Sequence, residues 1–317
     1  MKVKKYNVIQ DGFYGKMYWC KNRTETAIIV VTDDDVDAIV SKIACKWMLD
    51  REVNVLAVSP EKGTKGCHSF PLEQVESAID FLKHCGNKKI GIMGASASAM
   101  IALTAASYFQ EITLTIVLSP SDFVMEGYYQ DKLDGAGERP GEFESSLSYR
   151  GKQLPFLPYA YRHPEYWQKQ LEESKRRGDM IAARDMFDES ERRHPISEEE
   201  FIKIENIHGK LIMAGAEDDV LWDTCKYIRR MKKRMHEKKG KAECYAFLYE
   251  HGTHFIFPEN MLRKLLPIGI NIILPLVFKE AKGYTKECRE TRVSLEQHLI
   301  KQIMEWKIQT KEKKNVN

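Results

Sequence analysis

The sequence predicts an α/β protein with a mostly parallel central sheet, helices on both faces of the sheet and an inserted cap. Short apolar runs rich in β-branched residues alternate with longer segments in which apolar residues recur at helical spacing. This order is typical of parallel strands joined by helices, which cover both faces of the sheet. The rhythm stops after residue 121 and resumes near residue 205, and the residues between are rich in glycine, proline, aromatic and charged side chains.

Six short apolar segments are predicted as strands of this sheet because β-branched residues favour a pleated, buried surface. They are residues 27–31, 53–58, 89–93, 112–118, 210–214 and 243–249. Helices are predicted between and after them, at residues 37–50, 71–85, 98–109, 222–238 and 291–307. We therefore expect one domain over residues 1–317, with residues 121–205 inserted as a cap or lid.

Composition and charge exclude several classes of protein. The chain has 317 residues, of which 30% are charged, and a net charge of only +3, so it lacks the one-sided basic field of a nucleic-acid-binding protein. No apolar run is suited to a signal peptide or a membrane span. The seven cysteines are widely spaced, as in reduced proteins. We expect a cytoplasmic protein without a nucleic-acid or membrane partner, and the sequence is compatible with an oligomer.

A candidate nucleophile follows the third predicted strand, in the segment Gly94-Ala-Ser-Ala-Ser98. Ligands of such a sheet gather at the carboxyl ends of its strands, and a G-x-S-x-G turn there exposes a reactive serine. The pattern predicts Ser96 as the nucleophile and the N–H of Ala97, where the next helix begins, as an oxyanion donor. Ser98 stands where the pattern has a glycine. The alternative interpretation is an ordinary helix start with Ser98 as its N-cap.

Candidates for an acid and a base follow the last two predicted strands. A serine nucleophile needs an imidazole to accept its proton and a carboxylate to orient that imidazole. Asp218 and Asp219 follow the fifth strand, and their spacing does not separate them. His251 and His254 follow the sixth strand. His254 is favoured because Gly252-Thr253 forms a turn that would carry it over the edge of the sheet.

Three other patterns have ordinary interpretations that we prefer. Asp33-Asp34-Asp35 suggests a cation site, but consecutive carboxylates cannot all face one ion from a regular backbone. Cys67-His68 suggests a nucleophile and base, but sequence neighbours rarely have the required geometry. The basic run at residues 229–241 could contact phosphates or an anionic surface, but its apolar residues have the spacing of a solvated helix. We expect no metal and no cofactor.

Several segments resemble the C-terminal domain shared by acyl-CoA thioester hydrolases and bile acid-CoA:amino acid N-acyltransferases, a group with the α/β-hydrolase fold. The resemblance extends from about Asp11 to Trp306. Its most specific segments are Ser148-Tyr-Arg-Gly-Lys-Gln-Leu-Pro155 and Asp218-Asp219-x-x-Trp222, and Gly252-Thr-His-Phe-Ile-Phe-Pro258 also matches. It implies that Ser96 is the nucleophile, Asp219 the orienting acid and His254 the base. It also implies a small-molecule acyl substrate, such as an acyl-CoA.

The expected activity is therefore that of a serine acyl hydrolase acting on a thioester or an ester. Two alternatives are transfer of the acyl group to an amine and a catalytically silent protein that only binds a ligand. The family has a glycine-rich oxyanion loop where this chain has Thr32-Asp-Asp-Asp35. Backbone amides of Thr32 and Asp33 are the candidate donors there. Nearby carboxylates would raise the energy of a developing oxyanion, and this motivates the silent alternative.

Overall fold

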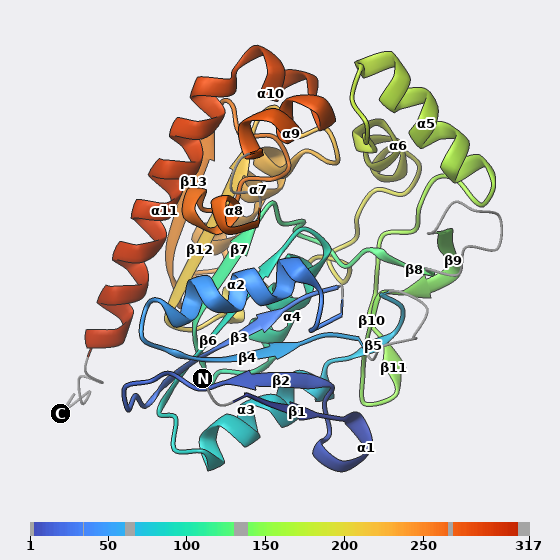
Figure 1. Ribbon diagram of the computed structural model, residues 1–317. Helices are drawn as coiled ribbons and strands as arrows, with labels where there is room; N and C mark the ends of the chain where they lie inside the picture. Colours follow the sequence, from blue (N-terminus) through green and yellow to red (C-terminus); the bar gives the residue numbers. More distant parts are fainter. Residues whose placement is uncertain (1–2, 34, 61–66, 130–138, 266–268, 310–317) are drawn as a thin grey trace.

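The computed structural model describes residues 3–33, 35–60, 67–129, 139–265 and 269–309. Within them, the largest sheet has eight strands in the order β1-β2-β4-β3-β6-β7-β12-β13 (Figure 1). The strands are β1 (Val3–Tyr6), β2 (Gly15–Tyr18), β3 (Thr26–Val31), β4 (Asn54–Val58), β6 (Lys89–Ala95), β7 (Ile112–Leu118), β12 (Lys210–Ala216) and β13 (Glu243–Tyr249). From β4 to β13 all neighbours pair in parallel, and only the edge formed by β1 and β2 is antiparallel. The expected mostly parallel sheet is confirmed.

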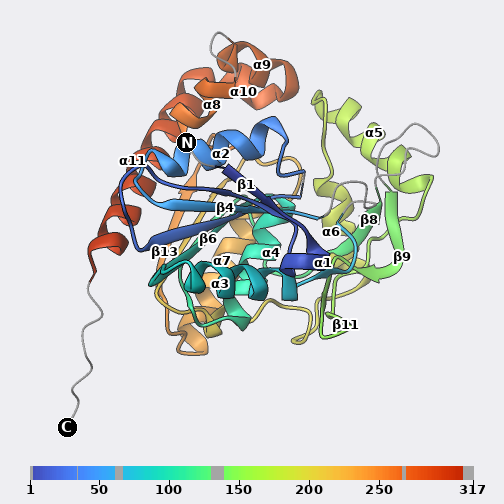
Figure 2. The same cartoon turned by 60° about the horizontal axis from the view of Figure 1, so that its bottom comes forward.

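Helices pack on both faces of this sheet (Figures 1 and 2). Successive side chains of a strand point to opposite faces, so Ile28 and Val30 of β3 join one core cluster while Ile29 and Val31 join the other. The first cluster lies under α2 (Ile39–Leu49) and α11 (Thr285–Ile308); the second lies under α3 (Glu73–His84), α4 (Ala97–Tyr108) and α7 (Thr224–Glu237). Burial of both faces explains why β3 is apolar along its whole length.

The chain between β7 and β12 forms small elements outside the main sheet. They are β8 (Glu126–Tyr129), β9 (Arg139–Ser145), β10 (Leu147–Tyr149), β11 (Lys152–Gln153), α5 (Glu165–Arg177), α6 (Arg184–Arg193) and the 3₁₀ helix η1 (Ile204–Asn206). β8 pairs with β9, while β10 pairs with β11 and with β5 (Phe70–Pro71). Tyr166 and Trp167 of α5 line the same cavity as the end of β6. The role of this segment as a lid stays a prediction.

In the described residues after β13 the chain forms α8 (Glu259–Leu265), α9 (Ile270–Val277), α10 (Lys279–Gly283) and α11. A further short helix, α1 (Val8–Asp11), precedes β2. The buried side of α11 includes Leu295, Leu299 and Ile303, which places the predicted C-terminal helix against the sheet. In the described part of the chain, every helix is too short or too polar to cross a bilayer.

Candidate active site

Ser96 lies in the turn between β6 and α4, with φ +56° and ψ −130°. A residue other than glycine is strained at such angles, and strain of this kind is concentrated at functional sites. The turn is tight, since a Cβ on Gly94 would lie 2.2 Å from the carbonyl oxygen of Ser98. The Ser96 amide donates to Leu118 O of the adjacent strand at 2.9 Å. The backbone is therefore held in a conformation that projects the Ser96 hydroxyl beyond the end of β6.

Ser98 occupies the second glycine position of the turn without capping the helix. Its hydroxyl donates to Ala95 O at 2.7 Å, so the side chain folds back onto the turn. The helix begins at Ala97, with Ser96 in the N-cap position. The alternative interpretation of Ser98 as an N-cap is wrong.

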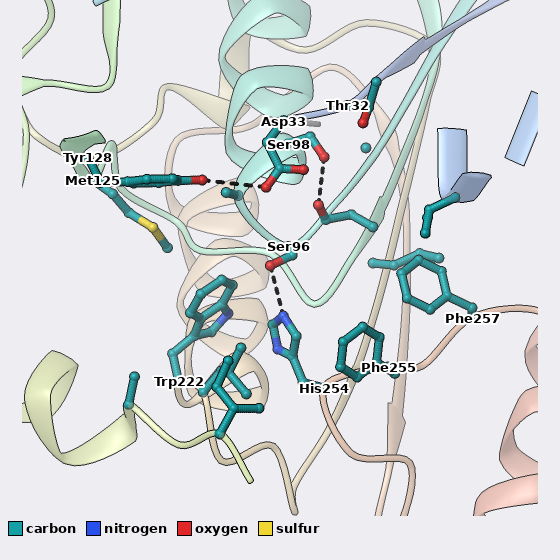
Figure 3. Close-up of a pocket in the computed structure, with 18 of the residues that line it drawn as sticks. Thr32, Asp33, Ser96, Ser98, Met125, Tyr128, Trp222, His254, Phe255 and Phe257 are labelled. Atoms are coloured by element: carbon teal, nitrogen blue, oxygen red, sulfur yellow. Dashed lines mark hydrogen bonds between the residues drawn. The ribbon is translucent and has the colours of Figure 1, made fainter. Parts of the chain in front are cut away.

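The structure brings Ser96, Asp219 and His254 together from the ends of β6, β12 and β13, and Figure 3 shows the contact between the Ser96 hydroxyl and the His254 ring. His254 Nε2 lies 2.8 Å from Ser96 Oγ. On the other side of the ring, Nδ1 lies 2.9 Å from Asp219 Oδ2 and 3.1 Å from Oδ1. His254 is only 4% exposed and Asp219 is fully buried. Asp219 Oδ1 also accepts the Leu221 amide at 2.9 Å, which fixes the carboxylate facing the imidazole.

The neighbouring acid and histidine have different partners. Asp218 Oδ1 accepts the Gly252 and Thr253 amides at 3.0 and 2.7 Å. His251 stacks on Tyr284, with ring centroids 3.7 Å apart. Burial raises the pKa of the Asp218 carboxyl to about 6, although these two amides stabilise its ionised form. Asp219, and not Asp218, therefore contacts the His254 ring, which the spacing of the two acids had left open.

Trp222 and Ser119 also contact the imidazole or its backbone. Trp222 meets the His254 ring edge-on, with centroids 4.6 Å apart. Its Nε1 donates to Ser119 O at 3.2 Å, and Ser119 Oγ donates to His254 O at 2.8 Å. Trp222 belongs to a motif recognised in the sequence, but its contact with His254 and the role of Ser119 were missed. The signal for Ser119 was its position directly after a predicted strand, since strand ends meet at the site.

The Ser96 hydroxyl faces a cavity of about 810 Å³. Most of its wall is apolar or aromatic, including Met125, Tyr159, Tyr166, Trp167, Phe187 and Phe257. Among the described residues of this wall, Asp33 is the one carboxylate and there is no lysine or arginine. Such a cavity suits an apolar group with one polar reacting end.

The three expected oxyanion donors differ in their surroundings. Ala97 is the first residue of α4, where a helix leaves its N–H without an intrahelical partner. The Thr32 amide, in contrast, donates to Val58 O at 3.0 Å and extends the pairing of β3 with β4. The expectation that Thr32 supplies a backbone donor is therefore wrong. Asp33 lines the cavity, and the role of its amide stays a prediction.

The acidic loop places one described carboxylate at the cavity. Asp33 receives a hydrogen bond from Tyr128 OH at 3.4 Å (Figure 3). Asp35 accepts a hydrogen bond from the Asp37 amide of its own loop at 2.7 Å and one from the hydroxyl of Tyr14, which precedes β2, at 3.1 Å. Asp34 lies outside the described residues. No group of three histidine, cysteine or acidic residues in the described ranges could hold a metal ion.

The other sequence patterns lie away from this chemistry. Cys67 is fully buried, and burial raises the pKa of its thiol, so it is a poor nucleophile. Within the basic run on α7, the guanidinium groups are ion-paired: Arg229 with Glu217, Arg230 with Asp122 and Glu191, and Arg234 with Glu198 and Glu205. These arginines therefore hold α7 to neighbouring segments of the protein.

Comparisons with known proteins agree with this fold. The family model described as BAAT / Acyl-CoA thioester hydrolase C terminal matches residues 70–261. An α/β hydrolase, MGS-M1, from a Medee basin deep-sea metagenome library is 12% identical, with a TM-score of 0.50 over 96% of this chain and 98% of that chain. A sugar hydrolase, YeeB, from Lactococcus lactis is also 12% identical, with a TM-score of 0.51 over 96% of this chain and all (100%) of that chain. Comparison with curated proteins gave no match.

Proposed function

Because the chain belongs to the BAAT / acyl-CoA thioester hydrolase C-terminal family and has the α/β-hydrolase fold, we propose that it is a serine acyl hydrolase. Its substrate is a carboxylic ester or an acyl-CoA-type thioester. The observation that carries the proposal is the continuous chain of contacts from Ser96 Oγ through the His254 ring to the Asp219 carboxylate, at 2.8 and 2.9 Å. Family membership supports a hydrolase, and this contact chain supports the serine mechanism.

The reaction begins when Ser96 Oγ attacks the acyl carbonyl carbon and its proton passes to His254 Nε2. Asp219 accepts a hydrogen bond from Nδ1–H and stabilises the imidazolium that forms. Collapse of the tetrahedral intermediate breaks the bond to the leaving thiolate or alkoxide, which takes the proton from Nε2. This leaves an ester between Ser96 and the acyl group. Water then attacks that ester with His254 again as base, which releases the carboxylic acid and restores Ser96.

The negative charge of each tetrahedral intermediate falls on the former carbonyl oxygen. We assign the Ala97 N–H as one donor to this oxygen because the start of α4 adds the positive end of the helix dipole. The Asp33 amide is the proposed second donor. The Asp33 carboxylate opposes this stabilisation by an amount that depends on how far water screens it.

The cavity wall supports an apolar acyl group. Its aromatic side chains from α5 and α6 offer large contact surfaces, and a group desolvated there gains free energy by burial. The described wall contains no lysine or arginine to neutralise a phosphate. A coenzyme A leaving group would therefore keep its phosphates outside this cavity.

The proposal is tested with purified protein, a panel of acyl-CoA thioesters and simple esters, and a fluorophosphonate probe. We expect wild type to release free acid and to gain the probe on Ser96, and Ser96→Ala to do neither. Adding glycine or taurine to the same assay detects acyl transfer by the mass of the amide. A wild-type protein that neither turns over a substrate nor binds the probe contradicts the proposal.

The matched control is Ser107→Ala, which removes a hydroxyl from α4, the helix that follows Ser96. Ser107 Oγ donates to Thr104 O at 2.7 Å within α4, away from the cavity wall. We expect it to be labelled and to hydrolyse substrate like wild type. Equal turnover by wild type and Ser96→Ala would show that another group is the nucleophile.

A further inference from the structure

The loop between β13 and α8 holds His254 next to a strained residue. Thr253 has φ +59°, in the left-handed region that disfavours β-branched side chains. Such a conformation persists only where the surroundings hold it. His254 follows directly in the chain, so the contacts that hold Thr253 also determine where the imidazole begins.

Asp218 supplies the contacts to this part of the loop. Its Oδ1 accepts the Thr253 amide at 2.7 Å, and its two oxygens accept the Gly252 amide at 3.0 and 3.2 Å. Hydrogen bonds to an ionised carboxylate are roughly twice as strong as those between neutral groups. The side chain is 8% exposed, so water competes little for these oxygens.

The opposite side of the loop is held by the helices that follow. His251 stacks on Tyr284, with the ring planes 10° apart, and the Thr291 hydroxyl of α11 donates to His251 O. His251 Nδ1 is buried and lies 3.6 Å from Asp218 Oδ2. The loop is therefore clamped between the turn after β12 and the start of α11.

Asp218 and Asp219 thus act on the same histidine by different routes. Asp219 contacts the imidazole directly, whereas Asp218 binds the two amides that precede it. Both carboxylates belong to the turn that follows β12. This one turn therefore positions both the backbone that precedes His254 and the His254 ring. Displacing a reacting group by about 1 Å can cost a factor of roughly 100 in rate.

We propose that Asp218 is a positioning residue, which holds the backbone at Gly252 and Thr253 so that His254 Nε2 stays within hydrogen-bond reach of Ser96 Oγ. The proposal rests on the proposed hydrolase function. It assigns Asp218 no contact with the substrate, because Asp218 is not part of the cavity wall. Its loss should therefore lower kcat and leave KM nearly unchanged.

The test compares Asp218→Ala with Asp218→Asn, in both steady-state hydrolysis and the rate of fluorophosphonate labelling of Ser96. For the alanine variant we expect kcat and the labelling rate to fall by about tenfold or more, with KM within about twofold of wild type. Asparagine keeps one oxygen that can accept an amide, so Asp218→Asn should recover part of both rates. All variants are assayed below the onset of thermal unfolding.

Asp223→Ala is the matched control. Asp223 lies in the same connection as Asp218, between β12 and α7. It accepts a hydrogen bond from the Lys226 amide at the start of α7 and forms an ion pair with Arg184. We expect this variant to melt at a lower temperature but to keep the wild-type kcat. A fall in kcat for Asp223→Ala equal to that for Asp218→Ala would overturn the proposal, because any weakened turn would then suffice.

The two proposals fail in different ways. A wild-type protein that is neither labelled nor active contradicts the hydrolase function itself. An active, labelled wild type with an equally active Asp218→Ala contradicts only the positioning role. Where the alanine variant does not fold, Asp218→Asn decides: a kcat lowered about threefold or more at unchanged KM supports the role, and an unchanged kcat overturns it.

Discussion

The indole of Trp222 meets the imidazole of His254 edge-on, with the ring planes at 83° to each other. The same indole is tied by Nε1 to Ser119 O, and Ser119 in turn binds the backbone of His254. Trp222 therefore holds the His254 ring by direct packing and the His254 backbone through Ser119.

Trp222→Phe should lower kcat several-fold, because it removes the Nε1 bond and part of the ring contact. Trp222→Ala should lower it further and reduce the free energy of unfolding by about 3–5 kcal/mol, as expected for a large buried aromatic residue. Steady-state kinetics and thermal unfolding measure the two effects. The control is Trp306→Phe, which loses a similar bond from Nε1 to Thr113 Oγ1 far from the cavity. An equal loss of kcat in both variants would contradict a specific role for Trp222.

Asp219→Asn should reduce kcat by roughly 10³–10⁴-fold with little change in KM. The amide would present a donor or a weaker acceptor to Nδ1, so the imidazole would no longer hold the tautomer that accepts the Ser96 proton. The prediction is checked by kcat and by the rate of probe labelling. Asp223→Asn, in the same connection, should remain within about twofold of wild type. An Asp219→Asn variant that retains most of its activity would contradict the assignment.

Asp33→Asn should raise kcat/KM for uncharged acyl groups by roughly fivefold. The change removes a negative charge from the cavity wall, and a unit charge a few ångströms from the oxyanion raises its energy by about 1 kcal/mol in a well-screened site. The gain should shrink at high salt. We would measure kcat/KM at low and high ionic strength. A lower rate in the variant would instead indicate that the carboxylate helps to bind substrate or to order the loop.

The contacts of Asp37 predict that the free energy of unfolding depends on pH. Hydrogen bonds from Lys16 and Lys5 hold the pKa of the Asp37 carboxyl well below its usual range. Because the pKa is lowered on folding, the ionised group stabilises the native state above a pH of about 4, and this contribution is lost as the pH falls further. The side chain is 32% exposed, so solvent limits the effect to about 1 kcal/mol or less.

The corresponding measurement is the difference in melting temperature between wild type and Asp37→Asn across pH. We expect wild type to melt higher at pH 7 and the difference to disappear on acidification. A difference that persists unchanged at low pH would mean that the asparagine acts through packing and not through the lost charge.

The parallel strands of the large sheet were the most predictable part of the fold. The predicted boundaries of β7 and β13 agree with the structure, because both are continuous apolar or alternating runs flanked by turn residues. β1 and β2 were missed. They have four residues each, and β1 carries two exposed lysines, so neither has the pattern of a buried strand.

By itself the sequence determined which chemical groups follow which strands: a hydroxyl at Ser96 and pairs of acids and histidines after the last two strands. Strand ends meet at one edge of a parallel sheet, so this order already indicated a common site. Only the tertiary structure showed that Asp219 contacts the His254 ring, that this ring reaches Ser96 Oγ, and that the Thr32 amide donates to Val58 O. Neighbouring side chains point in different directions, and strand register depends on contacts between residues distant in the chain.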